Sequence, residues 1–143
     1  MKKIIFIVIL FASVAVIAQK SAAQDAAKKA FAQTYPNATK VKWEKEDGNY
    51  EVSFIDKGNE ISVIYNSKGV LQEAEQEMKA GALPTTILSY MKEHYKGISV
   101  KSGAKITKAD GSVNYEAAIK GKDVLFDSNG RFIKEVKEEK EKD

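Results

Sequence analysis

Apolar residues recur along the chain with two different periods, one typical of helices and one typical of strands. A helical stretch followed by strand-like stretches occurs twice. Apolar residues recur at helical spacing from Ala27 to Phe31, and again from Ile87 to Tyr95. After each helical stretch, apolar and polar residues alternate one by one, as in half-buried strands. These alternating stretches are residues 41–43, 50–54 and 61–65, and then 115–119 and 124–126. Each half of the chain is therefore predicted to form one helix followed by about four antiparallel strands.

Local sequence matches support the same division. Asn49-Tyr50-Glu51 corresponds to Asn114-Tyr115-Glu116, and residues 64–69 correspond to residues 125–130. Both copies keep these signals in the same order, which indicates an internal repeat of about 60 residues. Glycine follows a polar residue at each expected turn, where it supplies the positive φ of a short hairpin.

These elements predict an α+β fold. Two α-β-β-β-β repeats would form one antiparallel sheet of about eight strands, with both helices on one face. A unit of one helix on four strands is only marginally stable by itself, so the two copies are expected to pair edge to edge. The second face of the sheet would then stay open.

The N-terminal stretch has the pattern of a secretory signal. Lys2 and Lys3 precede an apolar run from Ile4 to Ile17, and small residues follow it. The run is shorter than the roughly 20 residues of a spanning helix. We therefore predict a signal peptide over residues 1–18, with a cut as late as residue 23 as the alternative. The mature part would contain a first repeat at 24–78, a second at 79–136 and a charged tail at 137–143. No membrane anchor would remain after cleavage, and the product would be periplasmic or secreted.

Composition excludes several function classes. Without Lys2 and Lys3, 21 basic residues stand against 20 acidic ones, a balance that argues against a nucleic-acid partner. The chain has no cysteine, so a thiolate nucleophile and a disulfide framework are excluded.

The two repeats, their Asn-Tyr-Glu segments, the Phe126–Gly130 turn and the Leu83-Pro84 helix start resemble the PepSY-like, β-lactamase-inhibitor-like family of secreted Bacteroidetes proteins. The resemblance covers essentially all of the mature chain. It implies two small α+β units that build a curved sheet with a concave binding face. Inhibition of a β-lactamase does not follow from it, because no inhibitory loop residue of that group can be matched here.

No residue carries a recognisable catalytic, cofactor-binding or metal-binding pattern. His94 is the single histidine, so it has no histidine or cysteine partner for a metal. The Asp127–Gly130 segment resembles the start of a calcium loop, but Arg131 stands where an oxygen ligand is needed. A type I turn explains it better. We therefore expect no enzyme, no cofactor and no metal.

The open sheet face is the candidate binding surface. The residues predicted to line it are Trp43, Ile55, Ile64, Ala118 and Leu125. Trp43 is the most ambiguous of these, because its strand also fits the helix-covered face. The predicted function is binding, and in one version inhibition, of a protein or peptide partner in the cell envelope. The alternative is a periplasmic small-ligand or envelope-stress binding protein that uses the open face or a groove between the repeats.

Overall fold

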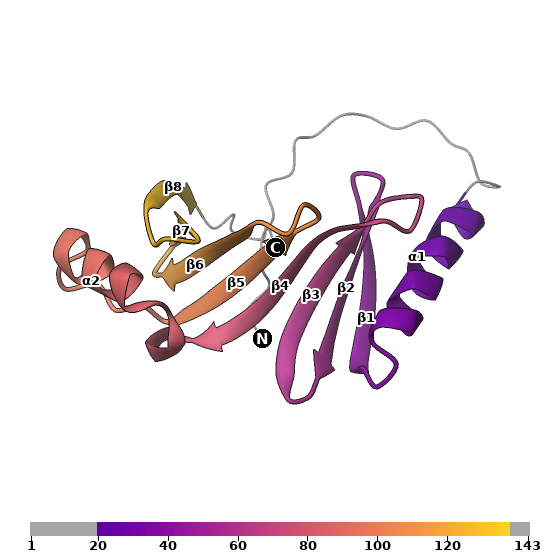
Figure 1. Ribbon diagram of the computed structural model, residues 1–143, viewed down its shortest axis with the longest axis horizontal. Helices are drawn as coiled ribbons and strands as arrows, with labels where there is room; N and C mark the ends of the chain where they lie inside the picture. The colour runs from indigo at the N-terminus through magenta and orange to yellow at the C-terminus, as the bar shows by residue number, and fades with distance from the viewer. Residues whose placement is uncertain (1–19, 138–143) are drawn as a thin grey trace. The chain divides into compact units, whose positions relative to one another are not determined.

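The computed structural model describes residues 20–137, and it contains the predicted α+β fold (Figure 1). The predicted signal peptide at 1–18 and all but the first residue of the 137–143 tail lie outside the described residues. Two helices and eight strands follow in the expected order. They are α1 (Lys20–Thr34), β1 (Thr39–Glu46), β2 (Asn49–Asp56), β3 (Asn59–Tyr65), β4 (Leu71–Lys79), a 3-10 turn η1 (Ala80–Ala82), α2 (Thr85–His94), β5 (Ser102–Lys108), β6 (Val113–Ile119), β7 (Lys122–Asp127) and β8 (Phe132–Lys137).

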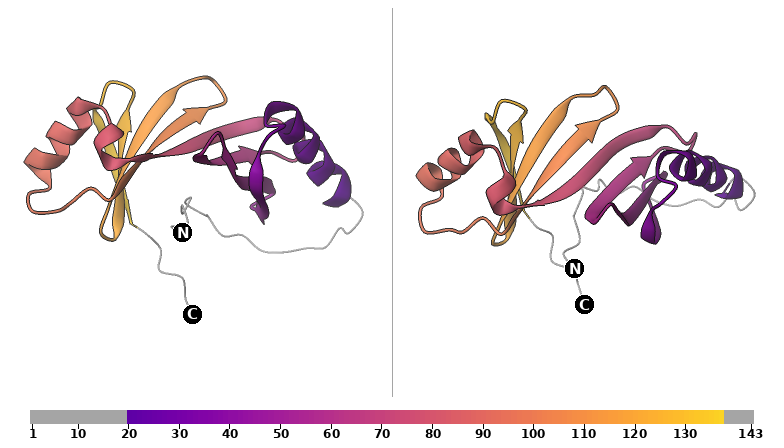
Figure 2. Two further views of the ribbon diagram at one scale, coloured as in Figure 1. Left: turned by 90° about the horizontal axis from the view of Figure 1, so that it is seen from below. Right: turned by 60° about the horizontal axis from the view of Figure 1, so that its bottom comes forward.

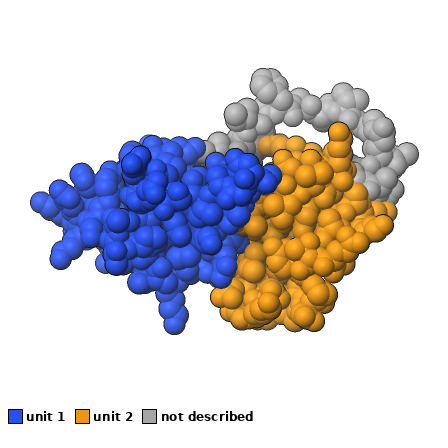
Figure 3. Space-filling view, in the orientation of Figure 1, with its two compact units in different colours: residues 1–5, 75–143 blue, residues 6–74 orange. Residues whose placement is uncertain are grey.

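The strands form one sheet in sequence order, β1 to β8. The chain also divides into two compact units, and the division falls inside β4, after Ala74 (Figure 3). The repeat boundary expected from the sequence lies a few residues later, after residue 78. Neither helix within residues 20–137 has the length and apolar character needed to span a bilayer.

The first unit along the chain has an aromatic core beneath α1. Phe31 of α1 packs edge-on against Phe54 of β2, with ring centroids 4.9 Å apart. Tyr50 and Val52 of β2 lie directly opposite Tyr65 and Val63 of β3 and belong to the same buried cluster. The alternate residues of these strands therefore point to the face that α1 does not cover.

In the second unit α2 lies beside the strands (Figure 2), and the core beneath it is mainly aliphatic. Ile87 and Met91 of α2 are buried together with Ala117, Val124 and Phe126 of β6 and β7. Ala117 lies opposite Val124 and Tyr115 lies opposite Phe126, so the register repeats that of β2 and β3. The predicted tandem repeat is thus confirmed.

The β3–β4 and β7–β8 turns have the same internal hydrogen bonds. Asn66 Oδ1 accepts the backbone N–H groups of Lys68 and Val70 at 2.9 and 3.0 Å. Asp127 Oδ1 accepts those of Asn129 and Arg131, both at 2.9 Å. The Asp127–Gly130 segment is therefore a turn, as its sequence predicted, and its carboxylate is engaged by the backbone.

Candidate functional site

The candidate site is the sheet face that lies away from the helix in each unit. Its members are identified by strand register, since directly opposite residues point to the same face. In the first unit Glu51 lies opposite Ile64, and Ile55 lies opposite Glu60. Ser62, on the same face, donates a hydrogen bond from its hydroxyl to a carboxylate oxygen of Glu51. This part of the face therefore combines two half-buried isoleucines with polar side chains.

Trp43 does not lie on this face, which corrects the sequence interpretation. It is paired with Val52, and its ring meets Phe31 of α1 at 5.5 Å and 83°. Its neighbours Lys42 and Glu44 take the open face instead, opposite Ser53 and Glu51. Alternation assigns Trp43 to one face or the other, but only contact with α1, distant in sequence, shows which face is covered.

In the second unit, the open face carries apolar and acidic side chains in alternation. Glu116 of β6 lies opposite Leu125 of β7, and Ala118 lies opposite Asp123. All four side chains are half-buried. Ala118 and Leu125 thus occupy the open face as predicted, whereas a binding role for them stays a prediction.

Strand β5 also contributes to this face, which was not predicted from the sequence. Ala104 and Ile106 lie opposite Glu116 and Asn114, are 3% and 5% exposed, and belong to neither helix-covered cluster. The residue between them, Lys105, is opposite Tyr115. The alternation of Ala104, Lys105 and Ile106 was visible in the sequence, but it would normally assign the apolar pair to the helix side.

A row of acidic residues on β4 was not predicted to belong to this face either. Glu73, Glu75 and Glu77 alternate with Ala74, Gln76 and Met78. Met78 packs against the core cluster beneath α2, so Glu75 and Glu77 point to the opposite face of the second unit. This alternation was also readable from the sequence alone.

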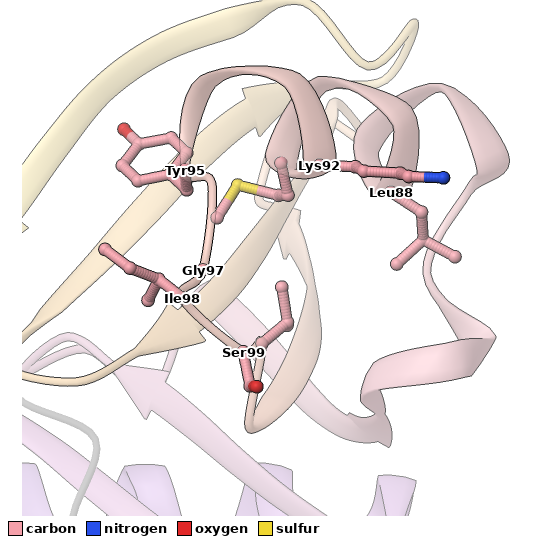
Figure 4. A pocket seen from close by; sticks show the side chains of 8 residues that line it. Leu88, Lys92, Tyr95, Gly97, Ile98 and Ser99 are labelled. Carbon is pink, nitrogen blue, oxygen red and sulfur yellow. The ribbon is translucent and has the colours of Figure 1, made fainter.

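A separate hollow lies on the α2 side of the second unit (Figure 4). It measures about 340 Å³ and opens between the C-terminal half of α2 and residues 97–100. Leu88, Met91, Ile98 and Val100 form its apolar lining, with Lys92 beside it. None of the predicted site residues lines this hollow.

Polar groups near the hollow hold β8 to the end of α2. Tyr95 donates a hydrogen bond from its hydroxyl to Glu135, and Lys122 Nζ lies 2.7 Å from Glu135 Oε2. Loss of solvent, together with this hydrogen bond, raises the pKa of Tyr95. The contacts with Lys122 and then Tyr95 lower the pKa of Glu135. These contacts tie Glu135 of β8 to Tyr95 at the end of α2 and to Lys122 of β7.

The described residues assemble no cluster of metal-binding side chains. His94, on the surface, stacks on Tyr90 with ring centroids 4.1 Å apart. Within residues 20–137, no group of three or more histidines or carboxylates is placed to hold a metal ion.

Comparison with known proteins agrees with the fold. Residues 17–73 and 72–134 each match the family described as "Putative beta-lactamase-inhibitor-like, PepSY-like". A BLIP-like protein from Bacteroides fragilis is 24% identical, with a TM-score of 0.67 over 83% of this chain and 90% of that one. A DUF2874 family protein from Bacteroides ovatus is 17% identical, with a TM-score of 0.70 over 78% and 85%. A protein from Bacteroides eggerthii, described as one of the "putative periplasmic proteins", is 12% identical, with a TM-score of 0.73 over 79% of this chain and 87% of that one. No curated protein matches the chain in sequence.

Proposed function

The chain belongs to the PepSY-like, β-lactamase-inhibitor-like family, and we propose that it is an exported, non-catalytic protein that binds a protein or peptide partner through its open sheet face. One observation carries this proposal. In each unit the helix covers one face of the strands, while the other face keeps half-buried apolar side chains among polar ones. These apolar side chains are Ile55 and Ile64 in the first unit and Ala118 and Leu125 in the second. Apolar area bordered by polar groups is the usual composition of a recognition surface.

Two further observations support a non-catalytic role. The single histidine, His94, lies exposed on the surface and stacks on Tyr90. Glu135, a carboxylate whose pKa is lowered, is bound by Lys122 and Tyr95 and does not face the candidate surface.

Export is the second part of the proposal. The predicted signal peptide at 1–18 and the periplasmic description of the Bacteroides eggerthii protein both agree with delivery across the inner membrane. A chain without cysteine gains nothing from the oxidising conditions there and must be stabilised by its two apolar cores.

The small-ligand alternative has weaker support. The hollow beside α2 is shallow, and only Lys92, Ser99 and Tyr95 give it polar side chains. Of these, Tyr95 is already bound to Glu135. Small-molecule sites usually enclose most of their ligand and offer several converging polar groups.

Site-directed photocrosslinking in the producing cells tests the proposal. A photoreactive residue at Ile64 or Leu125 is expected to give discrete higher-mass adducts. The same residue at Leu88, which is half-buried on the α2 side, serves as the matched control and should give none. Adducts from Leu88 alone would place the partner on the helix side. The open-face proposal is also wrong if no position gives an adduct.

A further inference from the structure

The sheet has two edge strands, β1 and β8, and they differ in how well they could accept another strand. β8 pairs with β7 on one side, and within residues 20–137 no strand pairs with its other side (Figure 1). Such an edge presents a row of backbone N–H and C=O groups to which an extended segment can bond. The regularity of the backbone and the neighbouring side chains then decide which segment fits.

The backbone of β1 is interrupted, whereas much of β8 is regular. Lys40 of β1 has a left-handed φ of 52°, and the register with β2 shifts beside it. A distortion of this kind turns an edge away from a straight partner strand. β8 has a register shift near its start, where Ile133 is the extra residue, but Lys134 to Lys137 pair with β7 one for one. The second half of β8 therefore offers a straight edge.

Exposed apolar side chains lie at the start of β8. Phe132 and Ile133 are 42% and 44% exposed. The Phe132 ring stacks on Tyr90 of α2, with ring centroids 5.7 Å apart and an angle of 12° between the ring planes. Because this contact already holds the ring in place, an added strand that packs on Phe132 gains apolar contact at a small cost in conformational entropy.

The exposed charges of this edge are mainly basic. Lys134 and Lys137 of β8 are exposed, and so is Arg131 in the turn before the strand. Glu135, the one acidic residue of β8, is bound by Lys122 of β7. Lysine on an edge strand repels basic segments and admits acidic ones, so it narrows the range of strands that can pair there.

The acidic residues of β7 lie one strand further from an added segment. Asp123 and Asp127 are on the same face as Lys134. Adjacent strands are about 4.8 Å apart, so these two carboxylates would lie roughly 10 Å from the added backbone. That distance exceeds the screening length of about 8 Å at physiological salt. Lys134, on the adjacent strand, therefore dominates the charge that the segment meets on this face.

We propose that the outer edge of β8 accepts an extended segment of a partner protein in which acidic residues alternate with apolar ones. Alternation puts the acidic side chains on one face of the segment and the apolar ones on the other. This matches β8, which has Lys134 on the open face and Phe132 on the helix-covered face. The inference goes beyond open-face binding, because the segment would lie beside the sheet and extend it by one strand.

The test is an NMR titration of the purified protein with a short peptide of alternating glutamate and valine. Strand addition should shift the amide signals of β8 and protect its outward-facing amides from hydrogen exchange, while the amides of β1 stay unprotected. The same peptide with every backbone nitrogen methylated keeps its charge and side chains but has no N–H donors, so it should give no protection. A peptide of alternating lysine and valine should not bind.

Charge reversal on the protein supplies the matched comparison. Lys134→Glu should weaken binding of the glutamate peptide about fivefold, because it replaces attraction by repulsion at an exposed pair. Lys92→Glu is the same change at an exposed position of α2 and should leave the affinity unchanged. Phe132→Ala should also weaken binding, and the Lys134 variant keeps the test valid if loss of the ring loosens β8. Equal loss in the Lys134 and Lys92 variants would overturn the proposal, because binding would then follow net charge alone.

Other outcomes separate this inference from the proposed function. If the peptide shifts amides of β2, β3 and β6 without protecting β8, it binds the open face and the edge inference is wrong. If β8 becomes protected as the protein concentration rises without peptide, the edge pairs with a second copy of the chain, which also overturns the inference. If the peptide protects β8 but crosslinking at Ile64 and Leu125 captures nothing, the edge inference holds and the open-face proposal fails.

Discussion

In the first repeat Trp43 of β1 lies opposite Val52, whereas the corresponding pair in the second repeat is Gly103 of β5 and Ala117 of β6. Tryptophan, which has the largest side chain, is thus replaced by glycine, which has none. In the second repeat the space is filled from another direction, because a Cβ atom on Gly103 would stand 2.6 Å from Leu83 Cδ2. The two repeats keep one backbone plan and fill it with different sets of side chains. Core residues are therefore exchanged as groups, since each choice fixes its neighbours.

The same exchange occurs at the far end of each helix. In the first repeat Tyr35, Ile61 and Ala74 pack against the aromatic core. Equal spacing from the shared turn places Lys122 and Glu135 where Ile61 and Ala74 stand, with Tyr95 as the counterpart of Tyr35. An apolar corner in one repeat is a hydrogen-bonded, charged corner in the other.

The largest effect is expected from uncoupling Leu83 and Gly103. Leu83→Ala should lower the free energy of unfolding by about 2–5 kcal/mol, as for other buried leucines. Gly103→Ala should cost about 1–3 kcal/mol, because its Cβ would enter the space of Leu83. In the Leu83→Ala background, Gly103→Ala should cost almost nothing, since the obstructing side chain is gone. Denaturant unfolding of the four proteins measures this coupling, and strictly additive costs would contradict it.

Intermediate effects are expected at the glycines of the hairpin turns. Gly69 and Gly130 both have positive φ and approach the helix of their own repeat. A Cβ on Gly69 would meet the backbone oxygen of Ala26 at 2.7 Å, whereas one on Gly130 would meet Thr86 Oγ1 at 2.2 Å. A backbone atom cannot rotate away as a side-chain atom can, so Gly69→Ala should be the more damaging substitution.

Gly121→Ala is the matched control for both, because Gly121 has φ of +81° and nothing within 4 Å of its Cβ position. It should cost about 1–2 kcal/mol, the penalty for a left-handed residue. For Gly130→Ala and Gly69→Ala, the steric contact with the helix should add about 1–3 kcal/mol to this backbone penalty. If thermal melts show the same loss of stability for Gly121→Ala and Gly69→Ala, close contact between these turns and their helices does not contribute to the cost.

Turn and strand chemistry could be predicted from the sequence because both are local. Asn66 and Asp127 stand at the start of turns that require glycine three residues later, and these turns fix the spacing of the repeat. The sequence did not show equally well which side chains lie on the helix-covered face of the sheet and which lie on the open face. Alternation separates Trp43 from Lys42, but it does not say which of them α1 covers. On β5, Ala104 and Ile106 point away from α2 because Leu83 occupies the other side at Gly103.

The smallest effect is expected at the charged corner of the second repeat. Glu135→Ala installs the residue that the first repeat has at this position. The contacts of Glu135 with Lys122 and Tyr95 lower its folded pKa below the ordinary value of 4.5. A depressed carboxylate pKa stabilises the fold above the unfolded pKa, and this contribution is lost as pH falls through the folded pKa. The melting temperatures of wild type and Glu135→Ala should therefore differ most near neutral pH and converge in acid. Val136→Ala, on the same strand, removes no titrating group, so its difference from wild type should stay constant over that range. A Glu135→Ala difference that persists unchanged in acid would mean that the side chain acts by packing, as Ala74 does in the first repeat.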